Sequence, residues 1–207
     1  MADAQLIAAL GSRGMGKSAW VKQLLAKVKP PRLAVWDLMQ EYEGEGTTDL
    51  GAVIRGMKGA RWRVVFYPSG DKKVRAQQFD LFCRALMASS TKARPVFAVL
   101  EELAFVTSPS WAPGAWQEVT LLGRHRGLSV VGTSQRPASI DKDFLGNCTM
   151  VHCAGLGYLP DAKAVAVRLG CDPQELMNLE QLHYLERGDG EKVAKKGALS
   201  FGRKRSP

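Results

Sequence analysis

Residues 11–18 read Gly-Ser-Arg-Gly-Met-Gly-Lys-Ser and match the pattern G-x-x-x-x-G-K-S. An apolar run, residues 6–10, precedes them and a helical pattern follows, which is the strand–loop–helix context in which this pattern binds phosphate. The glycines let backbone N–H groups close around an anion, and the helix N-terminus adds partial positive charge. A glycine-rich turn that arose by chance is the alternative, but it would not explain why an apolar run precedes the loop and a helical pattern follows it. The sequence therefore predicts a nucleoside triphosphate site.

Two side chains of this loop have predicted chemical roles. Lys17 would neutralise oxygens of the β- and γ-phosphates, and Ser18 would place its hydroxyl on Mg²⁺. We expect Lys17 to be open to the ligand rather than packed. ATP and Mg²⁺ are the predicted cofactors, and the residues expected to contact the nucleotide are Gly11, Ser12, Arg13, Gly14, Met15, Gly16, Lys17, Ser18 and Ala19.

Glu101 and Glu102 directly follow a second apolar run, residues 96–100. In P-loop NTPases the first acid after such a strand holds the Mg²⁺ shell, and the next can polarise the attacking water. Glu101 is therefore the predicted metal residue and Glu102 the predicted general base, although Asp is usual at the first position. The alternative is two exposed acids that begin a helix. The acid pair, and the lack of an Asn-Lys-x-Asp motif, favour ATP over GTP.

Gln135 follows a further apolar strand pattern, residues 128–133. Parallel sheets place ligands at the carboxyl ends of their strands, so this amide is positioned to orient a water against the γ-phosphate. A polar residue that only ends a strand is the alternative.

Three segments in this order resemble the FtsK–HerA ATPases. They are residues 11–18, the strand end Val99-Leu100-Glu101-Glu102-Leu103, and residues 123–128 leading into 133–137; Asp37 and Glu41 also look like the short acidic segment of that superfamily. The block from residue 123 is the most discriminating, and the resemblance spans about residues 5–187. The compact length is most similar to the genome-packaging ATPases of tailless, membrane-containing viruses.

This resemblance implies a RecA-like (ASCE) P-loop fold and a ring-shaped homo-oligomer, hexameric in the family, that moves double-stranded DNA. It also implies an arginine that acts on the ATP of a neighbouring subunit. Arg124 is the first candidate and Arg126 the second; Arg136 competes, and surface ion pairing is the alternative for each. Capsid or portal-vertex proteins are further expected partners, in the host cytoplasm or at the packaging vertex. A non-packaging HerA-like ATPase or assembly factor, or a small-molecule kinase, remain as alternatives.

Composition fits one soluble α/β domain. The chain has 207 residues, of which 45% are hydrophobic and 24% charged. No apolar stretch approaches the roughly 20 residues of a membrane span, and no signal peptide is recognisable. The net charge of +9 favours binding to a polyanion. Part of the charge lies near a predicted basic tail, residues 196–207, in Lys192, Lys195, Lys196, Arg203, Lys204 and Arg205. A solvated tail without a partner is the alternative.

The apolar runs predict a mainly parallel sheet covered by helices on both faces, a three-layer sandwich. Strands are expected at 6–10, 33–36, 63–67, 96–100 and 128–133, and helices from the loop to about 29, at 74–87 and at 115–125. Residues 182–187 and 192–194 are predicted to form a hairpin around 188–190. The four cysteines lack metal-ligand spacing and are expected to be free thiols, buried in the case of Cys83. Trp111 and Trp116 are expected in a loop.

Overall fold

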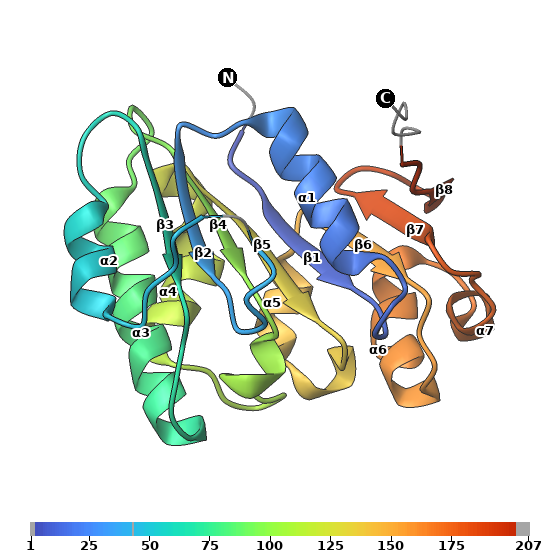
Figure 1. Cartoon of the computed structure of the whole chain (residues 1–207). Coiled ribbons are helices and arrows are strands. Elements are labelled where there is room, and N and C mark those ends of the chain that lie inside the picture. The colour runs from blue at the N-terminus through green and yellow to red at the C-terminus, as the bar shows by residue number, and fades with distance from the viewer. Residues whose placement is uncertain (1–2, 43, 202–207) are drawn as a thin grey trace, which may run out of the picture.

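An eight-stranded sheet crosses the middle of the protein in the order β3-β2-β4-β5-β1-β6-β7-β8 (Figure 1). The structure is a computed structural model that describes residues 3–42 and 44–201, so Arg203, Lys204 and Arg205 of the predicted tail lie outside it. The strands are β1 (Leu6–Leu10), β2 (Arg32–Trp36), β3 (Trp62–Phe66), β4 (Val96–Leu100), β5 (Leu128–Ser134), β6 (Met150–Ala154), β7 (His183–Gly188) and β8 (Lys195–Ala198).

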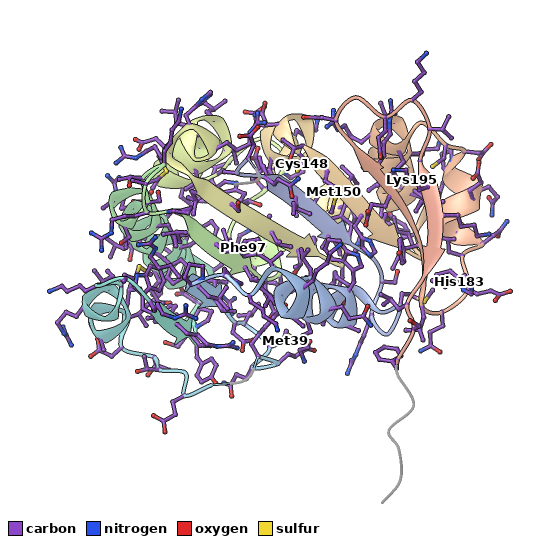
Figure 2. The ribbon with its side chains drawn as sticks, turned by 90° about the horizontal axis from the view of Figure 1, so that it is seen from above. Met39, Phe97, Cys148, Met150, His183 and Lys195 are labelled. Carbon is purple, nitrogen blue, oxygen red and sulfur yellow. The ribbon has the colours of Figure 1, made fainter. Side chains whose placement is uncertain are left out.

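The first six strands in the sheet order, from β3 at the edge to β6, pair in parallel. β7 and β8 add an antiparallel hairpin at the other side. Figure 2 views the sheet from above, with Phe97 on β4, Met150 on β6, and His183 and Lys195 in the hairpin. Because the parallel strands share one direction, all their carboxyl ends meet at one edge. The predicted mainly parallel α/β sandwich is confirmed.

Alternating strand residues serve two separate cores, as the two-residue period of a strand requires. Ile7 and Ala9 of β1 pack with Trp20 and Val21 of α1 (Lys17–Val28), which covers one face. The opposite face packs against the remaining helices (Figure 1). These are α2 (Leu50–Gly56), α3 (Lys72–Ser89), α4 (Gly114–Leu122), α5 (Lys142–Asn147) and α6 (Leu159–Leu169), with α7 (Pro173–Met177) beside α6.

The helix predicted at 115–125 ends earlier than expected. α4 stops at Leu122, and Arg124–Arg126 form a separate 3₁₀ turn, η2. Gly127 closes this turn with φ 77°, where an added Cβ would approach the Thr91 carbonyl oxygen to 2.7 Å. The chain therefore turns at a position that only glycine fits, and this turn overrides the helical pattern before β5.

The predicted hairpin is present, but its second strand begins later in the chain than the predicted residues 192–194. β7 pairs with β8, and residues 192–194 lie in the connection instead of the strand. Glu191 causes the difference: its carboxylate accepts a hydrogen bond from the Gly188 N–H at 2.8 Å, and its carbonyl accepts one from Arg187 Nε at 2.9 Å. The turn is thus longer than the glycine pattern predicts.

Trp116 is likewise not in a loop. It lies in α4, fully buried between Phe79 and Phe144, and its indole N–H donates to Asp141 Oδ2 at 3.2 Å. Trp111 does lie in the connection between β4 and α4 and is half exposed. The cysteines are free, and Cys83, Cys148 and Cys153 are buried. None of the helices within the described ranges combines the length and apolar character needed to cross a membrane.

Candidate active site

The glycine-rich loop, the acid pair and Gln135 meet in one pocket of about 240 Å³. The topology explains this meeting, because β1, β5 and β4 are neighbours and each is followed by one of these segments. The pocket is lined by Ser12, Arg13, Gly14, Gly16, Lys17, Ser18, Ala19, Met39, Glu41, Glu101, Glu102 and Gln135.

Contacts with the C-terminal half of the chain hold the loop in shape. The Ser12 N–H donates to the Gly155 carbonyl at 2.9 Å, and the Gln181 side-chain amide donates to the Gly14 carbonyl at 3.0 Å. Gly16 has φ 105°, and a Cβ there would come within 2.9 Å of the Leu199 side chain. The loop is therefore folded around backbone conformations that favour glycine, at the N-terminus of α1.

Lys17 differs from the expectation that it is open to ligand. Its side chain is buried, and Nζ lies 3.0 Å from Glu102 Oε1. A buried lysine keeps its charge only beside a partner, and Glu102 supplies the compensating charge. Lys17 is therefore held by an acid of the same pocket.

Glu102 is fixed by its backbone as well as by Lys17. It has φ 51°, an unusual conformation for a residue with a side chain, and begins the 3₁₀ turn η1 (Leu103–Phe105). Its N–H donates to Thr133 Oγ1 at 3.1 Å, and its Oε2 accepts the Gln135 N–H at 3.2 Å. These bonds tie the end of β4 to the end of β5.

Glu101 lies beside another buried acidic residue. It is buried beside Asp37 at the end of β2, and its carboxylate accepts the Met39 N–H at 3.3 Å. Burial, first, and then Asp37 raise the pKa of Glu101 to about 8. The alternative of two exposed acids at a helix start is wrong for both glutamates, since each has less than 5% of its surface exposed.

Asp37 is a site residue whose role the sequence did not reveal. It is fully buried, and its two carboxylate oxygens accept the N–H groups of Glu41 and Tyr42 at 2.9 and 3.0 Å. Asp37 thereby shapes the loop after β2, which brings Met39 and Glu41 to the pocket on the α1 side of the sheet (Figure 2).

The donor set fits a magnesium ion. Burial and the neighbouring Asp37 carboxylate raise the pKa of Glu101, and a cation beside these two acids would favour their charged forms. Ser18 lines the same pocket. Mg²⁺ in nucleotide sites keeps several waters and needs few protein ligands. Among the described residues, no group of three or more His, Cys, Asp or Glu is arranged to hold a metal ion by itself.

The arginine candidates lie in two places. η2 precedes β5, so Arg124 and Arg126 lie at the edge where β1 begins, whereas the glycine-rich loop follows the end of β1. They are not brought to the pocket of their own chain. Arg136 follows Gln135, but its Nε lies 2.8 Å from Asp161 Oδ2 and its guanidinium covers the Tyr158 ring.

Comparisons with known proteins identify proteins that this chain resembles in sequence or in fold. No protein-family model matches the chain. It is 25% identical to Protein P9 of Pseudoalteromonas phage PM2, over 93% of this chain and 89% of that protein. The structure of the genome packaging NTPase B204 from Sulfolobus turreted icosahedral virus 2, in complex with AMPPCP, superposes with a TM-score of 0.77 at 17% identity, covering 95% of this chain and 98% of that one.

A bacterial conjugative coupling protein, TrwB, superposes with a TM-score of 0.66 at 10% identity, covering 97% of this chain and 86% of that one. The predicted P-loop NTPase fold is confirmed, and so is the predicted resemblance to viral genome-packaging ATPases.

Proposed function

We propose that this protein is an ATPase that moves double-stranded DNA and packages a viral genome. The observation that carries the proposal is the single pocket in which the loop 11–18, the buried acid pair and Gln135 converge. The similarity to B204, a genome packaging NTPase, supports packaging, and the net charge of +9 supports a polyanionic substrate.

The geometry suggests how binding and hydrolysis are ordered. ATP phosphates would draw Lys17 from Glu102, because the phosphates carry more charge than one carboxylate. Glu102, released from its partner but still bonded to Gln135 and Thr133, would then accept a proton from the attacking water. Gln135 would orient that water. Ser18 and Glu101 would hold Mg²⁺, which neutralises charge on the phosphates when bound.

The position of η2 supports sharing of the site between subunits. Arg124 and Arg126 lie away from the pocket of their own chain, so either can complete a pocket only from a neighbouring subunit. We infer a homo-oligomeric ring, hexameric by the family resemblance, that acts in the host cytoplasm or at the packaging vertex with capsid or portal-vertex proteins.

A second candidate function uses the same motor for another DNA transfer. The similarity to a conjugative coupling protein favours it over a small-molecule kinase. The two motor functions would share the pocket and the DNA dependence and differ in the protein partner.

The test is ATP hydrolysis by the purified protein, with and without a linear duplex of mixed sequence. We expect Mg²⁺-dependent release of phosphate that rises severalfold with DNA. Hydrolysis that is indifferent to DNA, or transfer of phosphate to a small molecule, would contradict the proposal.

A further inference from the structure

A second pocket, of about 440 Å³, is lined by residues of α1, β2 and β3 and of the loops beside them. Four cationic residues from two elements and a loop line it: Lys22, Lys29, Arg61 and Arg63. Leu25, Ala26, Pro30, Leu33 and Tyr42 provide its apolar surface. We call these nine residues the basic groove.

The cations of the basic groove have little compensation. Among the residues that the structure describes, no acidic residue lines the groove, and neither Lys29 nor Arg61 makes an ion pair. Arg63 already has a partner, so the inference rests on the other three. Lys29 ends α1, where a cation offsets the helix dipole. That explanation does not extend to Lys22, inside α1, or to Arg61, ahead of β3.

Tyr42 connects the basic groove to the active site. Its ring lies 5.7 Å from Lys22 Nζ, and its N–H donates to Asp37. Its hydroxyl is buried, and burial, followed by the carboxylates of Glu101 and Asp37, raises the pKa of Tyr42. One face of this side chain therefore meets Lys22 of the groove, while its backbone N–H meets Asp37 of the active site.

We propose that the basic groove binds the sugar–phosphate backbone of duplex DNA. This inference rests on the proposed function and adds the surface that contacts DNA. Phosphate is the chemistry that clustered lysine and arginine recognise without regard to sequence.

The test compares two variants with the same change in charge. Lys29→Glu/Arg61→Glu alters the basic groove, whereas Lys142→Glu/Lys163→Glu alters exposed lysines of α5 and α6 that make no ion pair within the described ranges. Binding of a mixed-sequence duplex of 30 base pairs is followed by fluorescence anisotropy across a salt series. For the groove variant we expect at least about tenfold weaker binding, and a salt slope reduced by about one to two, one for each lost phosphate contact.

Several outcomes would overturn the assignment. Equal losses in the two variants would show a general charge effect. Unchanged DNA binding with a changed oligomeric state, measured by sedimentation, would make the groove a subunit contact. If the groove variant lost affinity for tripolyphosphate but not for DNA, both measured in a Lys17→Ala background, the groove would be a site for free phosphates. Wild-type protein that binds no DNA would instead refute the proposed function.

Discussion

The buried pair of Lys17 and Glu102 sets the behaviour of the site at the scale of single residues. Each charge is buried, so each depends on the other until a nucleotide arrives. Removing one member of a buried ion pair typically costs about 3–5 kcal/mol of stability, because the other charge stays behind without a partner. Substitution at either position therefore changes stability as well as catalysis, and an experiment must separate the two.

A double variant separates them. Lys17→Ala should lower ATP hydrolysis at least about a hundredfold, equivalent to about 3 kcal/mol, and should also lower the Tm. In Lys17→Ala/Glu102→Gln the unpaired carboxylate is gone, so we expect the Tm to recover while hydrolysis stays absent. Calorimetry and phosphate release measure the two effects. Turnover near the wild-type rate in either variant would end the ATPase assignment.

Glu101 gives the stability a predictable dependence on pH. Its pKa rises from 4.5 to about 8 on folding, so between these values the native state binds more protons than the unfolded state. Stability should therefore fall as the pH rises through this window and level off above it. Glu101→Gln removes the carboxylate, and each pKa unit is worth about 1.4 kcal/mol.

Thermal unfolding in EDTA measures this effect. We expect Glu101→Gln to raise the Tm by at least about 3 °C at pH 8.5 and to change it little at pH 5. Added Mg²⁺ should stabilise the wild type more than the variant at the higher pH. A Tm difference that is the same at both pH values would show that Glu101 is not the titrating group.

At the scale of elements, close packing between β5 and η1 holds Glu102 in place. A Cβ at Gly132 in β5 would lie 2.6 Å from Phe144 and 2.7 Å from Leu103, which directly follows Glu102. Both neighbours are fully buried and have no room to move. The spacing of these elements therefore depends on one missing methyl group.

Gly132→Ala should destabilise the protein by about 1–3 kcal/mol and lower ATP hydrolysis, because the added methyl group overpacks the contact behind Glu102. Gly146→Ala is the matched control: Gly146 lies in α5, and a Cβ there meets no atom within 4 Å. The control should be neutral or slightly stabilising. Denaturant unfolding and phosphate release would show the difference, and equal behaviour of the two variants would rule out tight packing at β5.

The sequence was sufficient for elements whose local pattern matches their environment. The apolar runs predicted the buried parallel strands β1 to β5, and the rule that ligands lie at carboxyl strand ends predicted the convergence on Gln135. β6 was missed because it contains His152, which is fully buried by stacking on Trp20 at 4.0 Å and by a contact with Glu186. Such compensation comes from distant residues and leaves no local signal.

The same limit applies to the site. Asp37 is adjacent to a predicted strand, yet its buried role depends on a loop that folds back onto it. The contact between Lys17 and Glu102 joins residues 85 positions apart. α6 begins with a buried acid, Asp161, that is satisfied by Arg136 and the Ala138 N–H. Long-range polar pairs of this kind are fixed only by the completed fold.

At the scale of the whole molecule, the arginine that we propose to act from η2 on a neighbouring subunit would make hydrolysis a property of an assembly. Arg124→Ala should bind ATP nearly as well as the wild type but hydrolyse it far more slowly, because the arginine acts on the transition state of a neighbour. Lys17→Ala chains keep Arg124, so mixing them into Arg124→Ala should restore part of the turnover. Phosphate release in mixtures of increasing ratio measures the rescue. If mixtures shown to co-assemble gain nothing, and Arg126→Ala behaves in the same way, the shared site is wrong.

Movement along DNA is the central claim, and displacement of a triplex-forming strand from a linear duplex tests it most directly. A motor that tracks the phosphate backbone removes the third strand without separating the duplex. We predict displacement by the wild-type protein that requires hydrolysable ATP and Mg²⁺, proceeds equally through unrelated duplex sequences, and is lost in Lys17→Ala. If the wild-type protein hydrolysed ATP in the presence of DNA but displaced no third strand, the account would be contradicted. Displacement that persisted in Lys17→Ala would contradict it as well.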